Sequence, residues 1–533
     1  MSFTPPEGGH ATSAASTAST GHSTPNAKES ERRFGVTPPA SLQEPTEADL
    51  AVSEQLKQDL ELDFPRETAE GLAHREQVLE ELERIVSEWI LEEGRSQGLS
   101  DETSFTAKIV TLGSYRLGVV QPGSDMDTLC IAPPHVAREA FFTAFLKKLE
   151  NHPHVSDCVP IPGAYTPIIK LKLRGVSIDL LFARLVRPLE PGSDLEAVKD
   201  DEILKDMDDK SVRCINGYRV ADQILSLVPN QEAFRETLRF VKCWARRRGI
   251  YSNVLGFFGG ITWALLVARV CQLYPNYCFS QLVNRFFRIY DQWNWSKPVL
   301  LCEVVESVPG ITGFKVWNPK TNHADKQHLM PVITPAFPAM NCTYNVTETT
   351  KRILLDEFRR GYEVVKKVEQ AKATWQEVHE PFPFFNNGPF MHYLCLEVLA
   401  KSPEIHVKFC GWVESKLRIL HKSLEGAVRG MQIHPNPEQY DLRNSDAEWP
   451  LGCGMFIELA FFQDQGALPG MMVDLRPTLH QFAEVVSQWS EKDVYNSNFK
   501  LKLMHCKRKQ LPEYALKAQA DKRTRRLCET ERS

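Results

Sequence analysis

The sequence predicts an α+β protein built from about three folded units with tails at both ends. A chain of 533 residues is too long for one compact core, because single domains seldom exceed ~300 residues. Strand-like runs follow one another between residues 108 and 182, whereas helical periodicity dominates before and after them. A hydrophobic content of 42% is ample for several cores.

Charge and cysteine content narrow the functional classes. The net charge of −5 argues against a protein that coats nucleic acid over its whole surface, so any RNA contact must be local. The 13 cysteines are an odd number without C-x-x-C pairs, which indicates neither a disulfide framework nor a zinc site. No apolar stretch reaches the ~20 residues that cross a bilayer and no signal peptide opens the chain, so we expect an intracellular protein without a membrane partner.

The first part of the chain changes character twice. Residues 1–48 are rich in Ser, Thr, Pro, Gly and Ala and predict a disordered tail. Two amphipathic helices are expected between Glu47 and Glu93, where apolar residues recur at helical spacing. The next region predicts four strands, with one helix between the second and third strands. The strands are Lys108–Leu112, Met126–Ile131, Ile168–Leu173 and Val176–Phe182, and the helix runs from about Val136 to Asn151.

The second half predicts a helical region and then a small α+β domain. Phe234–Arg248 carries an apolar stripe and ends at Gly249, a suitable C-cap residue. Gly260–Leu273 is almost entirely apolar and predicts a buried helix. After about residue 382 strand-like and helix-like runs alternate. These runs are Met391–Ala400, Phe409–Glu425 and Gly454–Phe462, and a strongly basic end follows them.

The segment with the clearest chemistry is LGSYRLGVVQPGSDMD, residues 112–127. Gly113 and Ser114 close a strand and open a helix, a turn that presents N–H groups and a hydroxyl to an anion such as a triphosphate. Asp125 and Asp127 follow on the next strand. Because side chains alternate along a strand, both carboxylates point to one face, ~7 Å apart.

A third carboxylate, Asp179, lies among apolar residues in the strand-like VSIDLLF. A D-x-D pair alone is more typical of a solvated loop or strand end. The Gly-Ser turn and the third Asp favour a site instead, because neighbouring anions repel unless cations lie between them. Carboxylate oxygens suit Mg²⁺ or Mn²⁺, and three carboxylates can hold two ions in the arrangement used for phosphoryl transfer.

These residues carry a resemblance to a known family. GSYRLGVVQPGSDMDTL and VSIDLLFA resemble the nucleotidyltransferase superfamily of DNA polymerase beta type. VKCWARRRGIYSNVLGFFGGITWALLVARVCQLYPN (241–276) and HLMPVITPAFPAMNCTYNVTETT (328–350) resemble eukaryotic nuclear poly(A) polymerases more specifically. The similarity covers roughly residues 49–511.

The resemblance implies an α+β fold of three domains between two tails. After the disordered tail 1–48, it implies N-terminal helices and a palm-like mixed α/β catalytic domain at 49–215. A helical middle domain, which the N-terminal helices join, is expected at 216–366. An RRM-like (ferredoxin-like) RNA-binding domain is expected at 367–511 and a basic tail at 512–533.

The resemblance also implies residue roles. The ligands of two Mg²⁺ or Mn²⁺ ions would be Asp125, Asp127 and Asp179. ATP would contact these aspartates together with Leu112, Gly113, Ser114, Ser124, Met126, Asn216, Lys242, Tyr251, Gly260 and Ile261. The RNA primer would contact Tyr165 and Lys170.

The implied activity is template-independent transfer of AMP from ATP to the 3′ hydroxyl of RNA. The implied setting is the nucleus, where a monomer would be recruited by the cleavage and polyadenylation machinery. Two alternatives stay open at this point. One is a terminal uridylyltransferase of the same fold, and the other is an inactive RNA-binding scaffold that keeps the fold without its chemistry.

Overall fold

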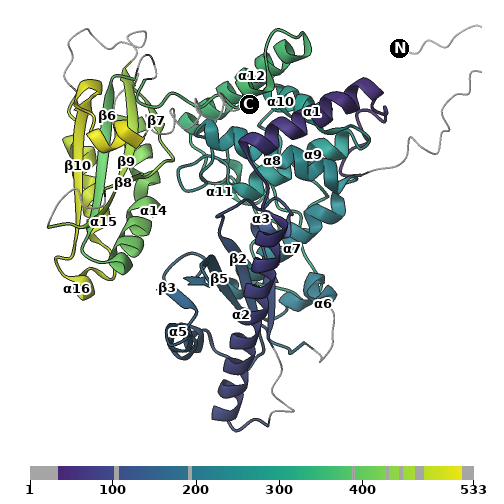
Figure 1. The fold of residues 1–533 in the computed structure, drawn as a ribbon. Coiled ribbons are helices and arrows are strands. Elements are labelled where there is room, and N and C mark those ends of the chain that lie inside the picture. Colours follow the sequence, from purple (N-terminus) through teal and green to yellow (C-terminus); the bar gives the residue numbers. More distant parts are fainter. Residues whose placement is uncertain are drawn as a thin grey trace, which may run out of the picture.

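The computed structural model describes residues 34–100, 107–189, 195–386, 388, 390–427, 431–442, 448–461 and 473–518. They form three lobes, seen at the bottom, upper right and left of Figure 1. We call residues 69–227 the first lobe, residues 34–63 and 231–378 the helical lobe, and residues 382–518 the C-terminal lobe. None of the helices among the described residues is both long and apolar enough to span a membrane.

The first lobe is built on a five-stranded sheet in the order β1-β2-β5-β4-β3, in which only β2 and β5 run parallel. The four predicted strands are confirmed. The edge strand β3 was not predicted, because its polar residues and Pro160 hide the alternation and a register shift interrupts its pairing. The strands are β1 (Lys108–Thr111), β2 (Met126–Ala132), β3 (Val155–Ile161), β4 (Ile168–Leu173) and β5 (Val176–Arg184).

Helices cover both faces of this sheet. On one face, α2 (Ala69–Ser96) packs Val86 and Trp89 into a core with Met126 of β2. On the other face, α7 (Asp209–Leu227) packs against Leu129 and neighbouring apolar residues. The predicted helix 136–151 is present as a continuous helical run with a π-helical middle. It comprises α4 (Arg138–Ala140), η1 (Phe141–Phe145) and α5 (Leu146–Glu150).

The helical lobe packs around an aromatic centre. Trp244 lies at 5.6 Å from Trp263 and at 5.7 Å from Phe358, measured between ring centroids. Both helices predicted here are confirmed, and Gly249 takes the positive φ of 68° that ends α8. The helices of this lobe are α1 (Glu47–Asp63), α8 (Gln231–Arg247), α9 (Gly260–Leu273), α10 (Phe279–Gln292) and α12 (Glu348–Glu369).

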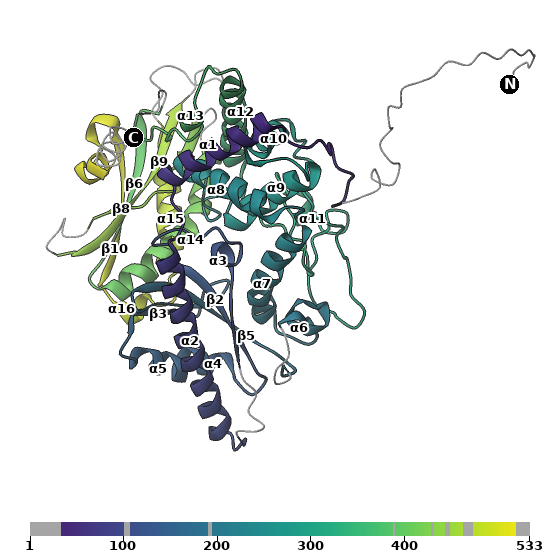
Figure 2. The same ribbon diagram turned by 45° about the vertical axis from the view of Figure 1, so that its right-hand side comes forward.

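The two N-terminal helices join different lobes. Helix α1 packs on α10 of the helical lobe, whereas α2 runs down the first lobe (Figure 2). The expectation that both helices join the middle domain is therefore wrong for α2. The apolar stripe of α2, which includes Val78, Leu82 and Trp89, is buried against the sheet instead.

The C-terminal lobe has the βαββαβ order of a ferredoxin-like fold. Its antiparallel sheet has the strand order β10-β6-β9-β7, which confirms the predicted α+β class and the RRM-like domain. The short β8 (Tyr440–Asp441) pairs with β9. The main elements are β6 (His392–Ala400), α14 (Pro403–Ala427), β7 (Met431–Pro435), β9 (Leu451–Phe461), α15 (Arg476–Ser487) and β10 (Phe499–Lys507).

Two of the expected domain limits fall inside helices and not between folded units. The limit at 215/216 falls inside α7, which packs on both β5 and α9, and the limit at 366/367 falls inside α12. The basic tail expected from 512 begins with packed residues, since Ala515 is fully buried. Residues 519–533 lie outside the described residues.

The remaining elements are short helices distributed over the three lobes. They are α3 (Gly113–Arg116), α6 (Glu196–Lys199), η2 (Asp201–Leu204), α11 (His323–Lys326), α13 (Trp375–Val378), α16 (Lys492–Tyr495) and η4 (Arg508–Gln510).

The end of the tail predicted to be disordered is ordered. Residues 34–46 dock on α9, where the N–H of Ala40 donates to the carbonyl of Leu273 at 2.8 Å and Arg269 donates to the hydroxyl of Thr37. This segment has no apolar periodicity in its sequence, because its contact with α9 is made by polar atoms. These atoms include a hydrogen-bond acceptor for the buried Arg269 guanidinium. Residues 1–33 of the predicted tail lie outside the described residues.

Candidate active site

Asp127 of β2 and Asp179 of β5 are partners in the parallel ladder. Adjacent strands lie ~4.8 Å apart, so the two carboxylates leave the same face of the sheet as neighbours. Asp125 precedes β2 and has the same parity as Asp127, which places it on that face as well. Asp125 is exposed, and Asp127 and Asp179 are half-buried. The structure thus brings together the three carboxylates that the sequence singled out.

The alternation of residues along the strands explains this placement. Met126 and Ile178 are register partners and are buried in the core under α2. The flanking odd-numbered residues must then face the opposite side, where Leu129 and other apolar residues farther along the strands pack against α7. At the start of β2 this second face is lined with carboxylates instead of a core.

Two turns set the position of the aspartates. The N–H of Leu112 donates to the carbonyl of Asp127 at 2.8 Å, which ties the end of β1 to β2. Gly113 follows with φ 54°, and a Cβ there would lie 2.2 Å from the carboxylate oxygen Oδ2 of Asp127. The second turn is closed by Ser124, whose hydroxyl donates to the carbonyl of Gln121 at 2.8 Å. Only glycine fits beside Asp127 without displacing its carboxylate.

A cavity of about 350 Å³ opens beside these carboxylates, between the first lobe and the helical lobe. Nine of the predicted site residues line it. They are Gly113, Ser114, Ser124, Asp125, Asp127, Lys242, Tyr251, Gly260 and Ile261, and they are joined by Leu117, Val119, Leu238 and Arg246.

Burial and like charge act together on Asp127. Burial raises its pKa, and the nearby charges of Asp179 and Asp125 raise it further, to about 6. The cationic groups of Lys170 and Lys242 lower the pKa of Asp127 but do not offset the increase. A carboxylate cluster held in this way is stabilised by cations, and its oxygen donors suit Mg²⁺ or Mn²⁺. Asp125, Asp127 and Asp179 therefore fit a divalent-metal site.

The opposite wall of the cavity is cationic. Lys242 of α8 is only 5% exposed and forms no ion pair with any residue that the structure describes. Burial and, to a smaller extent, the charge of Arg246 lower its pKa to about 7, although the charge of Asp127 acts in the opposite direction. Arg246 lies 4.9 Å from the ring centroid of Tyr251. The two cations and the Tyr251 ring form a wall that suits a polyanion.

The N-terminus of α9 also faces the cavity, through Gly260 and Ile261. Its N-cap residue Gly259 supplies no side-chain cap to the first turn. A Cβ on Gly260 would lie 2.7 Å from the hydroxyl of Tyr251, so the backbone and this ring are in close approach. Uncapped N–H groups at the start of a 14-residue helix favour an anionic or polar ligand.

Four predicted ATP contacts lie outside this lining, namely Asp179, which neighbours Asp127, and Leu112, Met126 and Asn216. Leu112 and Met126 are buried, at 5% and 0% exposure, and their side chains belong to the cores on opposite faces of the sheet. Only their backbones can reach the cavity. Asn216 is buried in α7, and its Oδ1 accepts a hydrogen bond from Arg219 at 3.1 Å. In this structure Asn216 supports Arg219 rather than the cavity.

The two predicted RNA contacts, Tyr165 and Lys170, lie on the first lobe, and Lys170 contacts one of the three carboxylates directly. Lys170 is the partner of Asp179 across β4 and β5, and its ammonium donates to both carboxylate oxygens, at 3.0 and 2.8 Å. Tyr165 is 62% exposed and lies under the Arg213 guanidinium at 4.3 Å. Tyr165 also lines a second cavity, of about 650 Å³, together with Arg418 and other residues.

Two features of the site were missed by the sequence reasoning. Arg246 is not among the residues predicted for the site, yet it lines the cavity. Its spacing of four residues from Lys242 was the available signal, because such residues share a helix face. The Lys170–Asp179 pair was also missed. The two-residue loop Arg174–Gly175, with φ values of 50° and 80°, fixes this register and marks a tight hairpin.

Three family models match the chain in the order of its lobes. The Poly(A) polymerase nucleotidyltransferase domain matches residues 35–228. The Poly(A) polymerase central domain matches residues 233–381, and the Poly(A) polymerase predicted RNA binding domain matches residues 383–450. Together the three matches cover most of the chain.

Curated relatives match over nearly the whole chain. Nuclear poly(A) polymerase 1 of Arabidopsis thaliana is 43% identical over 486 residues, which are 91% of this chain and 66% of the relative. Poly(A) polymerase of Dictyostelium discoideum is 39% identical over 497 residues, which are 92% of this chain and 60% of the relative. The chain thus spans about two thirds or less of these relatives' length.

Among solved structures, a cytoplasmic RNA terminal U-transferase is a distant neighbour. It is 14% identical, and the match covers 64% of this chain and 100% of that chain with a TM-score of 0.44.

Proposed function

Because this chain belongs to the poly(A) polymerase family, we propose that it transfers AMP from ATP to the 3′ hydroxyl of RNA without a template. The observation that carries the proposal is the pairing of Asp127 with Asp179 beside a cavity whose other wall holds Lys242. Carboxylates for divalent ions and cations for a triphosphate are the two parts that nucleotidyl transfer requires.

The metal ligands in this proposal are Asp125, Asp127 and Asp179, which hold two Mg²⁺ or Mn²⁺ ions. Bound ions supply a stronger 3′-oxygen nucleophile and neutralise the leaving pyrophosphate. The protein holds the three carboxylates on one face through the β2–β5 register and the turn at Gly113. The raised pKa of Asp127 supports the assignment, because burial and the charges of Asp179 and Asp125 disfavour its charged form more than Lys170 and Lys242 favour it.

The ATP-binding residues in this proposal surround the cavity. Lys242 and Arg246 face the phosphates, and the N–H groups at Gly113 and Ser114 add donors from the first lobe. Tyr251 and the first turn of α9 hold the nucleoside end. A triphosphate beside Lys242 would favour its charged form, because an adjacent anion raises the pKa of an ammonium group.

The RNA primer in this proposal approaches from the second cavity. Tyr165 offers an exposed ring for a base, while Arg213 and Arg418 offer charge for the phosphates. Lys170 would be free to bind a primer phosphate if ions held by Asp179 displaced its ammonium group. With a 41% exposed side chain, Lys170 has the room to make this change.

The proposal is tested by primer extension. The purified chain is incubated with an RNA oligonucleotide, Mg²⁺ or Mn²⁺, and each nucleoside triphosphate separately. Extension with ATP alone is expected. Preferential extension with UTP would favour a terminal uridylyltransferase, and RNA binding without any extension would favour an inactive scaffold.

The proposed primer path is tested separately with a variant of Tyr165. Tyr165→Ala is expected to raise the KM for RNA without changing the KM for ATP.

The cellular setting is a further part of the proposal. Relatives of this chain are named nuclear poly(A) polymerases, which supports a nuclear location. A role in adding poly(A) to transcripts implies recruitment of a monomeric enzyme by the cleavage and polyadenylation machinery. Light scattering of the purified chain tests the monomer, imaging of a tagged chain tests the location, and binding to purified cleavage factors tests the recruitment.

A further inference from the structure

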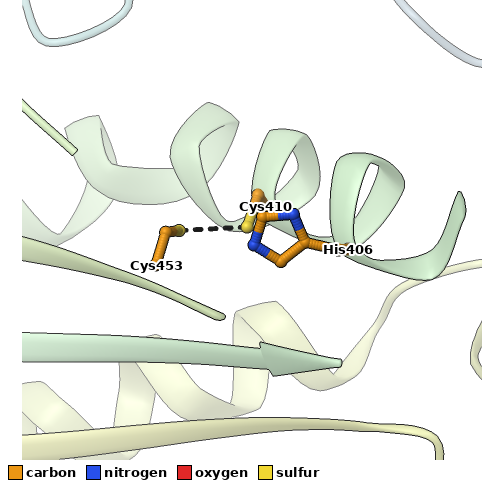
Figure 3. Close-up of side chains that lie close together, drawn as sticks. All are labelled: His406, Cys410 and Cys453. Atoms are coloured by element: carbon orange, nitrogen blue, oxygen red, sulfur yellow. Dashed lines mark hydrogen bonds between the residues drawn. The ribbon is translucent and has the colours of Figure 1, made fainter. Parts of the chain in front are cut away.

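Three side chains with soft or borderline metal-binding atoms meet inside the C-terminal lobe, away from the catalytic cavity. His406 and Cys410 lie one turn apart on α14, and Cys453 faces them from β9. The three side chains point toward one another (Figure 3). One ligand atom from each lies within 4.8 Å of the other two. This group could not be recognised in the sequence, because Cys453 is distant from His406 and Cys410 along the chain and no zinc-finger spacing is present.

The group is buried in the apolar core of the lobe. Cys410 and Cys453 are 7% and 4% exposed, and their sulfur atoms lie 3.0 Å apart. His406 is half-buried, which leaves a route to solvent on its side. The Nε2 atom of His406 is buried and makes no hydrogen bond of regular geometry with the described residues, and the ring has only the sulfur of Cys453 as a hydrogen-bonding neighbour. A thiol is a weak partner for a buried ring nitrogen, so a metal ion would satisfy this nitrogen better.

We propose that His406, Cys410 and Cys453 form a binding site for one Zn²⁺ ion that joins α14 to β9. Two thiolates and one neutral imidazole are typical zinc ligands. A water molecule completes the tetrahedron. This site is independent of the proposed catalytic site, whose carboxylates prefer the harder Mg²⁺ or Mn²⁺.

The geometry needs little change to accept the ion. Two sulfur atoms that are each ~2.3 Å from a tetrahedral Zn²⁺ lie ~3.8 Å apart, so the thiols must separate by less than ~1 Å. Both thiols lose a proton on binding. The resulting complex of Zn²⁺ with two thiolates and a neutral imidazole carries no net charge. A neutral complex is compatible with the surrounding core, where an isolated charge would be costly.

The imidazole of His406 favours a metal ion over a disulfide between Cys410 and Cys453. A disulfide would need the sulfur atoms to approach each other by ~1 Å, a change of similar size. It would, however, leave Nε2 of His406 without a partner, whereas an ion satisfies all three side chains. The second cluster of candidate ligands in the described residues differs in this respect. There Glu81 already has Arg174 as a cationic partner, and His154 is hydrogen-bonded to Glu81.

The test is metal binding by the full-length chain. The protein is stripped with a chelator and titrated with Zn²⁺ against a chromophoric competitor, and Co²⁺ is used as a spectroscopic substitute. One Zn²⁺ per chain is expected, with thiolate-to-Co²⁺ charge-transfer absorption. Bound Zn²⁺ should also protect Cys410 and Cys453 from alkylation, which mass spectrometry maps on the unmodified protein.

Variants locate the site. Cys410→Ser and Cys453→Ser should lower Zn²⁺ affinity by ~100-fold or more and abolish the Co²⁺ absorption. His406→Gln replaces a half-buried residue and should weaken binding while leaving the circular dichroism spectrum unchanged. Cys395→Ser is the matched control, because Cys395 is a buried thiol of the same sheet outside the cluster. Asp127→Asn, which alters the catalytic carboxylates, should also leave Zn²⁺ binding unchanged.

Three results would overturn the proposal. The first is a wild-type chain that takes up no Zn²⁺. The second is binding that persists unchanged in His406→Gln or in the double variant without Cys410 and Cys453. The third is a mass 2 Da below that of the reduced chain, with Cys410 linked to Cys453 and no Co²⁺ absorption, which would identify a disulfide instead.

Discussion

Asp127 and Asp179 face each other across the parallel strands β2 and β5, and this register places two carboxylates side by side on one face of the sheet. On its other side Asp179 is paired with Lys170 of β4, whose ammonium contacts both carboxylate oxygens. Strand register alone therefore builds a row of two carboxylates and one ammonium group. Burial, together with the charges of Asp179 and Asp125, raises the pKa of Asp127, and this excess of negative charge supports the proposed binding of cations.

The first prediction concerns stability and pH without metal ions. The pKa of Asp127 is about 6 in the folded protein, against ~3.9 when unfolded. A raised carboxyl pKa contributes stability below ~pH 4 that is lost as the pH rises through 6. Asp127→Asn should therefore be more stable than the wild type in EDTA, by about 1–3 kcal/mol at pH 7.5 and roughly half that at pH 5.

Urea denaturation at the two pH values measures this difference. Asp157→Asn is the control, because Asp157 is exposed and its φ of 51° suits Asn equally well. The control should show little change at either pH. Equal stability of Asp127→Asn and the wild type at pH 7.5 would contradict the repulsion inferred for the carboxylates.

A second prediction compares two glycines with similar backbones. Gly113 and Gly123 have φ values of 54° and 72°, so alanine is strained at both by ~1–2 kcal/mol. Only at Gly113 would the new Cβ collide with Asp127, because Gly123 has no atom within 4 Å of that position. Gly113→Ala should lose AMP transfer by ~100-fold or more, whereas Gly123→Ala should lose stability only. Similar activities of the two variants in primer extension would rule out this role for Gly113.

A third prediction concerns the lysine that contacts Asp179. Lys170→Met removes a cation that competes with metal ions, so it should raise the Mn²⁺ affinity of the RNA-free protein by ~3–10-fold. Lys172→Met is the matched control, since Lys172 is on the same strand but pairs with Asp157 instead. Isothermal titration with Mn²⁺ measures both. Weaker Mn²⁺ binding by Lys170→Met would show that Lys170 supports the metal site rather than competing for it.

A fourth prediction concerns the cationic wall. Lys242→Met keeps the aliphatic stem but removes the charge, and it should raise the KM for ATP by ~10–100-fold. Arg247→Met is the control, because Arg247 is on the same helix and pairs with Asp63 outside the cavity lining. Steady-state extension at varied ATP concentration distinguishes the two variants. An unchanged KM for Lys242→Met would remove this residue from the proposed ATP site.

Much of the fold could be predicted from the sequence, because its main elements obey simple periodicities. The alternation in MDTLCIA and VSIDLLFA identifies β2 and β5, and the apolar run after Gly260 identifies α9. Other features depend on tertiary contacts and leave no such pattern. The edge strand β3 is half polar, and residues 34–46 are ordered by polar contacts with α9.

The candidate site was predictable where its residues share a strand or a turn. Asp125, Asp127 and Gly113 fall in one short segment, so their proximity follows from local geometry. The placement of Asn216 against Arg219 depends on how α7 packs, and sequence reasoning could not show it. The cluster of His406, Cys410 and Cys453 joins residues from two elements of the C-terminal lobe, which only the fold brings together.

The most direct test of the account is the rate of AMP incorporation by variants of the three carboxylates. Asp125→Asn, Asp127→Asn and Asp179→Asn should each reduce ATP-dependent extension of an RNA primer with Mg²⁺ by ~1,000-fold or more, since each is proposed to hold the ions. Asp157→Asn should extend the primer like the wild type. Near-normal extension by any of the three variants would contradict the shared metal site on which the proposed function depends.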